Sequence, residues 1–131
     1  MPEYRKHIVN QVRNRGYDVS ICSGWGDLRD KELFRHKILI NIGYDPSCKI
    51  MEQIRCNRCI LNKMIVVSET KIDTEYIFSK NVVFSEYNTL ADKIIEVYDN
   101  YDRYYNILFS NFDDNIPIID NIQKSYLSIF T

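Results

Sequence analysis

Apolar residues fall into short runs whose spacing alternates between that of strands and that of helices. Lys37–Tyr44 and Met64–Val67 are continuous apolar stretches, as expected of strands that are covered on both faces. From Cys48 to Asn62, between these two runs, apolar residues recur at roughly helical spacing. Asp45-Pro46-Ser47 ends the first run, because proline cannot extend a central strand while aspartate and serine suit a helix entry. This order predicts a right-handed parallel crossover from strand to helix to strand.

The same reading extends to both sides of this unit. We expect an amphipathic helix, a strand, a helix, a later short strand and three final helices, at Glu3–Arg15, Tyr17–Ser23, Leu28–His36, Val82–Phe84, Leu90–Tyr98, Asp102–Phe112 and Ile118–Phe130. Alternation of this kind predicts an α/β fold, a single Rossmann-like three-layer domain with a small parallel sheet of about four strands and extra C-terminal helices. The chain, 1–131, is expected to be one domain, with a Rossmann-like core over 3–99 and a C-terminal helical extension over 100–131.

Composition narrows the class of protein without choosing a function. The 131 residues are 45% hydrophobic and 27% charged, which is ordinary for a globular domain. A net charge of −1 gives no general attraction to nucleic acid or to an anionic membrane. No apolar run reaches the ~20 residues that a membrane helix needs, and the polar N-terminus does not resemble a secretory signal. We therefore expect a cytoplasmic or virion location, with no nucleic-acid partner and no membrane span.

The residues that would support metal or cofactor chemistry lack the usual context. Cys56 and Cys59 form a CxxC, but it lies inside a predicted helix without a second CxxC or a nearby histidine pair. These cysteines are interpreted as thiols packed inside a helix, and His7 and His36 as structural residues. Dinucleotide, triphosphate and serine-hydrolase signatures are absent, as is any DxD motif. We expect no metal and no cofactor.

Polar residues gather where the two central strands end. Ligands of parallel sheets bind outside the carboxyl ends of the strands, which places Gly43–Ser47 and Ser68–Thr70 at one rim, with the next helix starting between them. Glu52 and Arg55, three residues apart, share one side of that helix. They are either a solvated ion pair worth a few tenths of a kcal/mol, or a ribose acceptor beside a diphosphate-binding guanidinium. The residues alone leave both interpretations open.

The order of predicted strands and helices from Asp27 to Asp102 is similar to that of a known protein family. A strand, a helix with the text KIMEQIRCNRCIL, a strand ending in Ser-Glu, a short strand and the helix NTLADKIIEV follow one another. This resembles the C-terminal, donor-binding half of GT-B glycosyltransferases, especially short forms from large DNA viruses and bacteria. The resemblance implies a domain that binds a nucleotide diphosphate-sugar donor.

The resemblance also implies a set of site residues. Glu52 would stand at the second acidic position of the paired-glutamate motif, which holds the ribose of the donor. The first acidic position falls on Tyr44, with Asp45 beside it and out of register. Arg55 matches a basic position of the viral forms. The implied donor-binding residues are Tyr44, Asp45, Ser47, Glu52, Arg55, Ser68 and Glu69.

Enzymes of this type work in a cleft between two domains, and only one is expected here. The implied partners are a nucleotide-sugar and either a second copy of the chain or a separate protein that carries the acceptor domain. A lone half could also bind donor weakly by itself or be a relic, so enzymatic activity stays open. No catalytic residue is assigned.

Two other functions compete with this one. A non-catalytic protein-interaction module on the same scaffold is suggested by the aromatic residues of the C-terminal half, Tyr98, Tyr101, Tyr104, Tyr105, Phe109, Phe112, Tyr126 and Phe130. A receiver-like or flavodoxin-like domain ranks last, because the early acidic pair and a phosphate loop are both absent.

Overall fold

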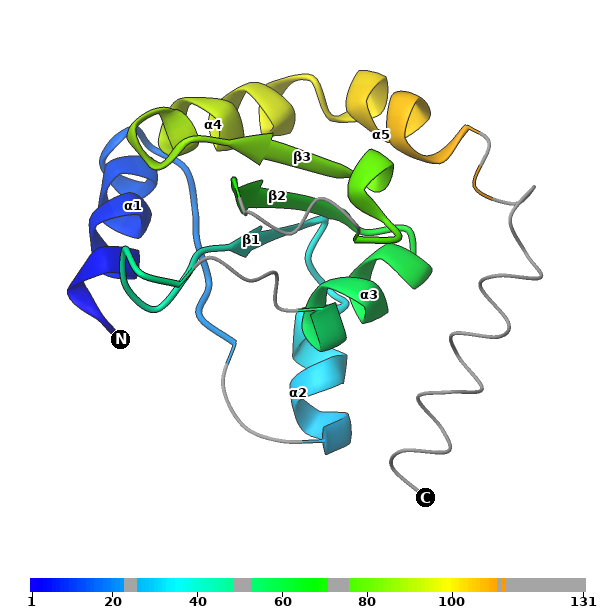
Figure 1. Cartoon of the computed structure of the whole chain (residues 1–131), viewed down its shortest axis with the longest axis horizontal. Helices are drawn as coiled ribbons and strands as arrows, with labels where there is room; N and C mark the ends of the chain where they lie inside the picture. Colours follow the sequence, from blue (N-terminus) through cyan, green and yellow to red (C-terminus); the bar gives the residue numbers. More distant parts are fainter. Residues whose placement is uncertain (23–25, 49–52, 71–75, 111, 113–131) are drawn as a thin grey trace.

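The structure is a computed structural model that describes residues 1–22, 26–48, 53–70, 76–110 and 112. Its centre is a small open parallel sheet in the order β1 (Ile38–Asn41), β2 (Ile65–Glu69) and β3 (Val82–Ser85) (Figure 1). Ile38 lies opposite Ile65, and Val66 lies opposite Val82. The mixed α/β class and the parallel pairing of the strands before and after the predicted crossover helix, β1 and β2, are therefore confirmed.

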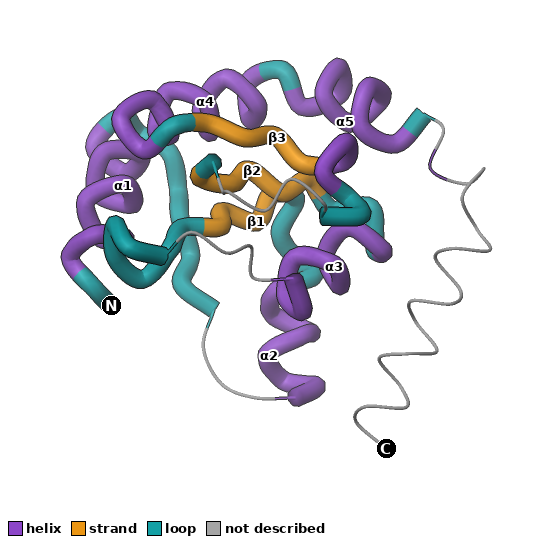
Figure 2. Tube along the Cα trace, viewed as in Figure 1, coloured by secondary structure: helices purple, strands orange, loops and turns teal. Residues whose placement is uncertain are grey.

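Five α-helices and two short 3-10 helices surround the sheet in the described part of the chain (Figure 2). They are α1 (Glu3–Asn14), α2 (Gly26–Leu33), α3 (Gln53–Leu61), η1 (Ser79–Asn81), η2 (Tyr87–Thr89), α4 (Leu90–Asp99) and α5 (Tyr101–Phe109). Figure 1 shows α4 and α5 on one side of β2 and α3 on the other, while α1 packs against α4. Within these residues, every helix falls short of the length and apolarity that crossing a membrane requires.

Strand β2 is the buried centre of the domain. All five of its residues are buried, and Ile65, Val66 and Val67 are fully enclosed. Helix α3 contacts it from one side, and α4 and α5 contact it as well. This explains why its sequence is a continuous apolar run without the alternation of a half-exposed strand.

Helices α1 and α4 each bury one apolar side against the rest of the domain. Helix α1 turns Ile8, Val9 and Val12 inward. Gly16, two residues beyond its end, has a φ of 92°, which is costly for a residue with a side chain. Helix α4 buries Leu90, Ala91, Ile94, Ile95 and Val97. The predicted break at Asn100 is confirmed, because that residue ends α4 and precedes α5. The predicted helix Ile118–Phe130 lies outside the described residues.

The predicted strand Tyr17–Ser23 is wrong, because residues 17–22 belong to no strand. The sheet has three strands within the described residues, where about four were expected. The Nη2 atom of Arg13 donates to the carbonyl of Val19 at 2.6 Å, so a side chain occupies an acceptor that a strand ladder would use. A cavity of about 610 Å³ is lined by this segment and by β1, and no ladder joins the two.

Helix α3 confirms the predicted character of the CxxC. The expected helix was Cys48–Asn62, and the described part of it is α3, since residues 49–52 lie outside the described residues. Cys56 and Cys59 are fully buried in the hydrophobic core. Burial raises the pKa of the Cys59 thiol to about 12. Both cysteines therefore serve as apolar packing groups.

Shortening a buried isoleucine to alanine should lower the free energy of unfolding more than shortening an exposed one. Ile60 is fully buried on α3, so Ile60→Ala should lower the free energy of unfolding by about 2–5 kcal/mol through lost burial and a cavity. Ile107 on α5 is 67% exposed, and Ile107→Ala is the matched control with a loss below about 0.5 kcal/mol. Urea denaturation of both variants measures the difference. Equal losses would contradict this assignment of the core.

Candidate functional site

Buried polar side chains concentrate at the carboxyl edge of the sheet. Among the described residues five polar side chains are buried, and four of them, Asn41, Ser68, Glu69 and Ser85, end the three strands. The strand register brings them together, because Asn41 pairs with Ser68 and Glu69 pairs with Ser85. Burying polar groups is costly unless they are hydrogen-bonded. At this edge, hydrogen-bonding side chains therefore take the place of the apolar side chains that pack the rest of the sheet.

Glu69 is the buried polar residue with the greatest need for hydrogen-bond donors, because it ends in a carboxylate and is only 7% exposed. Its Oε1 accepts the backbone N–H of Gly43 at 3.1 Å, and its Oε2 accepts the hydroxyl of Tyr4. Tyr4 stacks on Tyr87 with ring centroids 4.1 Å apart, and the Tyr87 hydroxyl donates to the Tyr4 carbonyl at 2.7 Å. The start of α1 is thereby fastened over the carboxyl end of β2.

Asn41 links the strand ends to helix α3. Its Nδ2 donates to Ser68 Oγ at 3.1 Å, and its Oδ1 accepts from Nη2 of Arg55 at 3.0 Å. Ser68 Oγ in turn donates to the Glu69 carbonyl at 2.9 Å. Three of the predicted site residues, Arg55, Ser68 and Glu69, therefore lie in one connected rim, as their positions in the sequence indicated.

A second arginine reaches the same strand end from α1. Nε of Arg5 donates to the carbonyls of Ile42 at 2.9 Å and Gly43 at 3.3 Å. Within the described part of the chain, its two terminal nitrogens make no hydrogen bond. Arg5, Ile42 and Arg55 also line the 610 Å³ cavity. Guanidinium groups from two different helices, α1 and α3, thus bind acceptors at the end of β1 and line the same cavity.

The cavity carries a marked excess of positive charge. Five cationic side chains line it, Arg5, Arg29, Arg35, Lys37 and Arg55, against one acidic residue, Asp18. Its remaining lining is largely apolar, and the segment of residues 17–22, β1 and α4 supply the largest parts of it. An apolar cavity with convergent cations and a volume of a few hundred Å³ suits an anionic small molecule.

The loop after β1 places the other predicted residues at the surface. Tyr44 is 64% exposed, and Asp45 and Ser47 are exposed as well. The Ser47 backbone N–H donates to Oδ1 of Asp45 at 2.8 Å, and the Ser47 hydroxyl donates to the same oxygen. These bonds lower the pKa of Asp45 below its usual value. Glu52 lies outside the described residues, so its predicted role stays a prediction.

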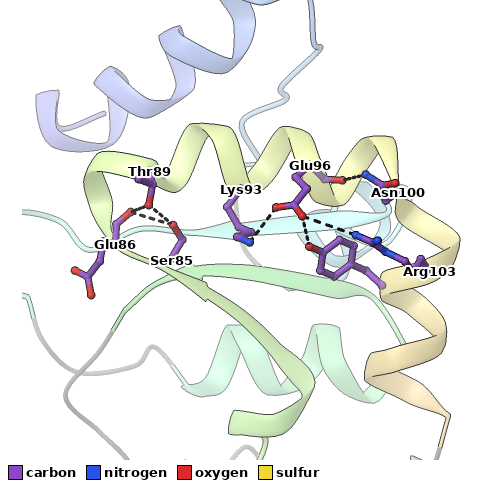
Figure 3. Close-up of polar contacts among 8 residues, drawn as sticks. Ser85, Glu86, Thr89, Lys93, Glu96, Asn100 and Arg103 are labelled. Carbon is purple, nitrogen blue, oxygen red and sulfur yellow. Dashed lines mark hydrogen bonds and ion pairs between the residues drawn. The ribbon is translucent and has the colours of Figure 1, made fainter.

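Polar contacts continue from the rim onto the third strand and α4 (Figure 3). Ser85 Oγ lies 2.9 Å from Thr89 Oγ1, and both hydroxyls donate to the Glu86 carbonyl. Further along α4, Glu96 accepts from Lys93 at 2.9 Å and from Tyr104 at 2.8 Å. Hydrogen bonding raises the pKa of Lys93 and lowers that of Glu96, as expected of a partly exposed ion pair within α4. The bond from Tyr104 to Glu96 joins α5 to α4.

The sequence did not reveal four residues that complete the rim. Asn41 and Ser85 carried a weak signal, because each is a polar residue at the end of an apolar strand. Tyr4 and Arg5 carried no such signal, because their contacts are distant in the sequence. Tyr4 contacts Glu69, 65 residues away, and Arg5 contacts Ile42, 37 residues away. On the predicted amphipathic helix, Tyr4 was expected to pack with the apolar stripe and Arg5 to face solvent.

Comparison with known proteins finds similarity to uncharacterised proteins of Acanthamoeba polyphaga mimivirus. One is 33% identical over 117 residues, which cover 84% of this chain and 41% of the relative. A second is 32% identical over 101 residues, which cover 73% of this chain and 11% of the relative, and a third is 31% identical over 105 residues, which cover 76% and 34%. The chain spans about two fifths of the first relative and less of the others. No family model matches the chain, and no solved structure matches it significantly.

The hydrogen bond from Tyr4 to the buried carboxylate of Glu69 predicts a measurable cost. Tyr4→Phe should lower the free energy of unfolding by about 1–3 kcal/mol, because it removes a hydrogen bond to a buried carboxylate. Tyr17→Phe removes a similar bond to Asp99, whose side chain is exposed, and should cost less. Urea denaturation compares the two, and a larger loss for Tyr17→Phe would contradict this account.

The same contact predicts sensitivity to alkaline pH. Burial, and then the bond to Glu69, raise the pKa of Tyr4 far above its usual value of about 10. Above pH ~10 the unfolded chain therefore loses a proton that the folded chain keeps, and the free energy of unfolding falls as pH rises. Below that pH the stabilisation is complete.

Urea denaturation between about pH 8 and pH 11 should show this fall, and the fall should be shallower in Tyr4→Phe. Tyr44→Phe, at an exposed position, is the control and should follow the parent curve. A parent protein whose stability stays level across that range would contradict the prediction.

Proposed function

We propose that the chain is a donor-binding domain of the glycosyltransferase type, which binds a nucleotide diphosphate-sugar at the carboxyl edge of its sheet. The observation that carries the proposal is that Arg5 and Arg55 both bind acceptors at the end of β1 and both line the cationic cavity. In this proposal the domain corresponds to a Rossmann-like half, of which the described strands form the core.

The diphosphate is the part of the donor that these arginines suit. A guanidinium presents a planar fork of N–H donors that matches phosphate oxygens, and it stays charged at all working pH values. Nε of Arg5 donates to two backbone carbonyls, which orients the guanidinium group. Its two terminal nitrogens can therefore still donate to a ligand. Arg55 is positioned by Asn41, a buried residue of the rim. Two positioned cations lose little freedom on binding an anion.

The predicted ribose contact comes from the resemblance. Glu52 would accept the ribose hydroxyls from the start of the helix that contains Arg55, and Ser68 and Glu69 would border the donor pocket. Glu69 already accepts hydrogen bonds from Gly43 and Tyr4, so in this proposal it stabilises the wall of the pocket. Glu52 is the residue proposed to bind the ribose.

Glycosyl transfer requires an acceptor site, which the proposal places on another domain or another chain. The mimivirus relatives are much longer than the region they share with this chain, which supports a domain that works beside further segments. Transferase activity of the isolated chain is therefore not part of the proposal, and donor binding is.

The alternative, a non-catalytic interaction module, draws on a different observation. In the described residues β1 and β3 are edge strands, and an unpaired strand edge can accept a strand from another protein. The described aromatic residues give weaker support than expected, because Phe109 and Phe112 are buried and, among those described, only Tyr98 is largely exposed at 59%. Tyr126 and Phe130 lie outside the described residues. We rank this function second.

Thermal shift with a panel of uridine and guanosine diphosphates and their sugar conjugates tests donor binding. A ligand at a hundred times its dissociation constant stabilises the folded protein by about 2.7 kcal/mol, or roughly 10 °C in a domain of this size. Arg5→Gln and Arg55→Gln should each reduce the shift. Arg103→Gln, at an exposed site on α5, is the matched control and should leave it unchanged.

The result that would overturn the proposal is the absence of any shift at millimolar ligand, with Glu52→Ala giving the same response as the parent. A shift that survives both arginine substitutions would move the site away from the end of β1.

A further inference from the structure

A second cluster of reactive side chains lies away from the rim, beside the turn that leads into β1. Cys22 ends the segment of residues 17–22, Glu32 lies on α2, and His36 follows that helix. Their sulfur, carboxylate oxygen and imidazole nitrogen atoms all lie within 4.8 Å of one another. Nε2 of His36 is 3.4 Å from Oε1 of Glu32.

We propose that Cys22, Glu32 and His36 form a zinc-binding site. Sulfur, nitrogen and oxygen together are the donor types that zinc takes in proteins, whereas magnesium and calcium require oxygen ligands alone. Three protein ligands leave a fourth position of the tetrahedron for water. The proposal is independent of sugar binding.

The distances are close to those that a tetrahedral ion requires. Zinc–ligand bonds of 2.0–2.3 Å place neighbouring ligand atoms about 3.3–3.6 Å apart. Glu32 and His36 already meet that separation at 3.4 Å. The remaining pairs are at most 4.8 Å apart, so they would need to close by no more than about 1.5 Å, which a rotation of the Cys22 or Glu32 side chain can supply.

The backbone holds the three ligands in place. Leu33, between Glu32 and His36, is buried, and the backbone N–H of His36 donates to the Leu33 carbonyl at 3.2 Å. Helix α2 is also tied to α3 by the ion pair between Asp30 and Arg58. The segment before Cys22 is held by the bond from Arg13 to the Val19 carbonyl. Bound zinc would tether this segment to the turn before β1, which no strand ladder does.

The charged groups around the cluster permit a cation. Arg35 lies 3.6 Å from Glu32, but its side chain is 78% exposed and can turn into solvent. Arg29 and Lys37 line the cavity that Cys22 and His36 also line, so the open coordination position has access to that space. Without an ion, burial and the nearby Glu32 raise the pKa of Cys22, which keeps the thiol protonated. Zinc would displace that proton.

Cobalt(II) is the probe, because it occupies zinc sites and reports its ligands by absorption. Cobalt(II) added to metal-free protein should give the visible bands of a four-coordinate ion and the near-ultraviolet band of thiolate-to-cobalt charge transfer, and equimolar zinc should remove both. Cys22→Ser should abolish the charge-transfer band. His36→Gln should weaken affinity by at least about 10–100-fold, the loss typical of removing even an outer-shell partner.

Matched controls use the other residues of the same types. Cys48→Ser and His7→Gln alter exposed positions outside the cluster and should keep the spectrum and the affinity of the parent. Circular dichroism of each metal-free variant shows whether it folds. If Cys22→Ser does not, alkylation of Cys22 in the parent protein, slowed at least tenfold by zinc, serves as the second measurement. A parent without the charge-transfer band, a band retained in Cys22→Ser, or alkylation unaffected by zinc would overturn the proposal.

Discussion

The carboxylate of Glu69, buried at the end of the central strand, constrains the structure around it. A buried charge is tolerated only with hydrogen-bond donors close by, and Glu69 draws them from two distant segments, the Gly43 backbone after β1 and the Tyr4 hydroxyl of α1. Satisfying one side chain thus fixes the loop after the first strand and the start of the first helix. The rim, with its two arginines, exists because these segments are brought to the end of β2.

This constraint separates two kinds of surface on one sheet. Along β2 the side chains are apolar and enclosed, and they supply packing free energy. At the strand ends, Asn41, Ser68 and Ser85 replace them and form hydrogen bonds that fix direction as well as contact. A site that recognises a polar ligand needs both, because the apolar layer gives the polar groups a rigid support.

The sequence predicted the part of the fold that depends on local patterns. Apolar runs located β1, β2 and β3, and helical spacing located α1, α3 and α4, because each buries a face whose period is visible in the chain. The prediction of a strand at Tyr17–Ser23 was wrong because alternating apolar and polar residues also suit an extended segment outside a sheet. Whether such a segment joins the sheet depends on long-range features, here the bond from Arg13 and the cavity beside β1. Ser68 and Glu69 were placed at the rim from the sequence because strand ends converge in parallel sheets, and Arg55 because it lies on the helix between those strands. The positions of Tyr4 and Arg5 depend on long-range docking that no local pattern records.

The position of α1 has a consequence for how the chain is assembled. The three strands lie in the sheet in the order in which they are synthesised, so each can be added beside its predecessor as the chain lengthens. Helix α1 is made first, yet it packs on α4 and is fastened by Tyr87, which follows Tyr4 by 83 residues. Its apolar stripe therefore has no native cover until most of the domain has been translated. The amphipathic helix therefore lacks its native partner from the time it is made until α4 has been translated, and an exposed apolar surface of this kind promotes aggregation during folding.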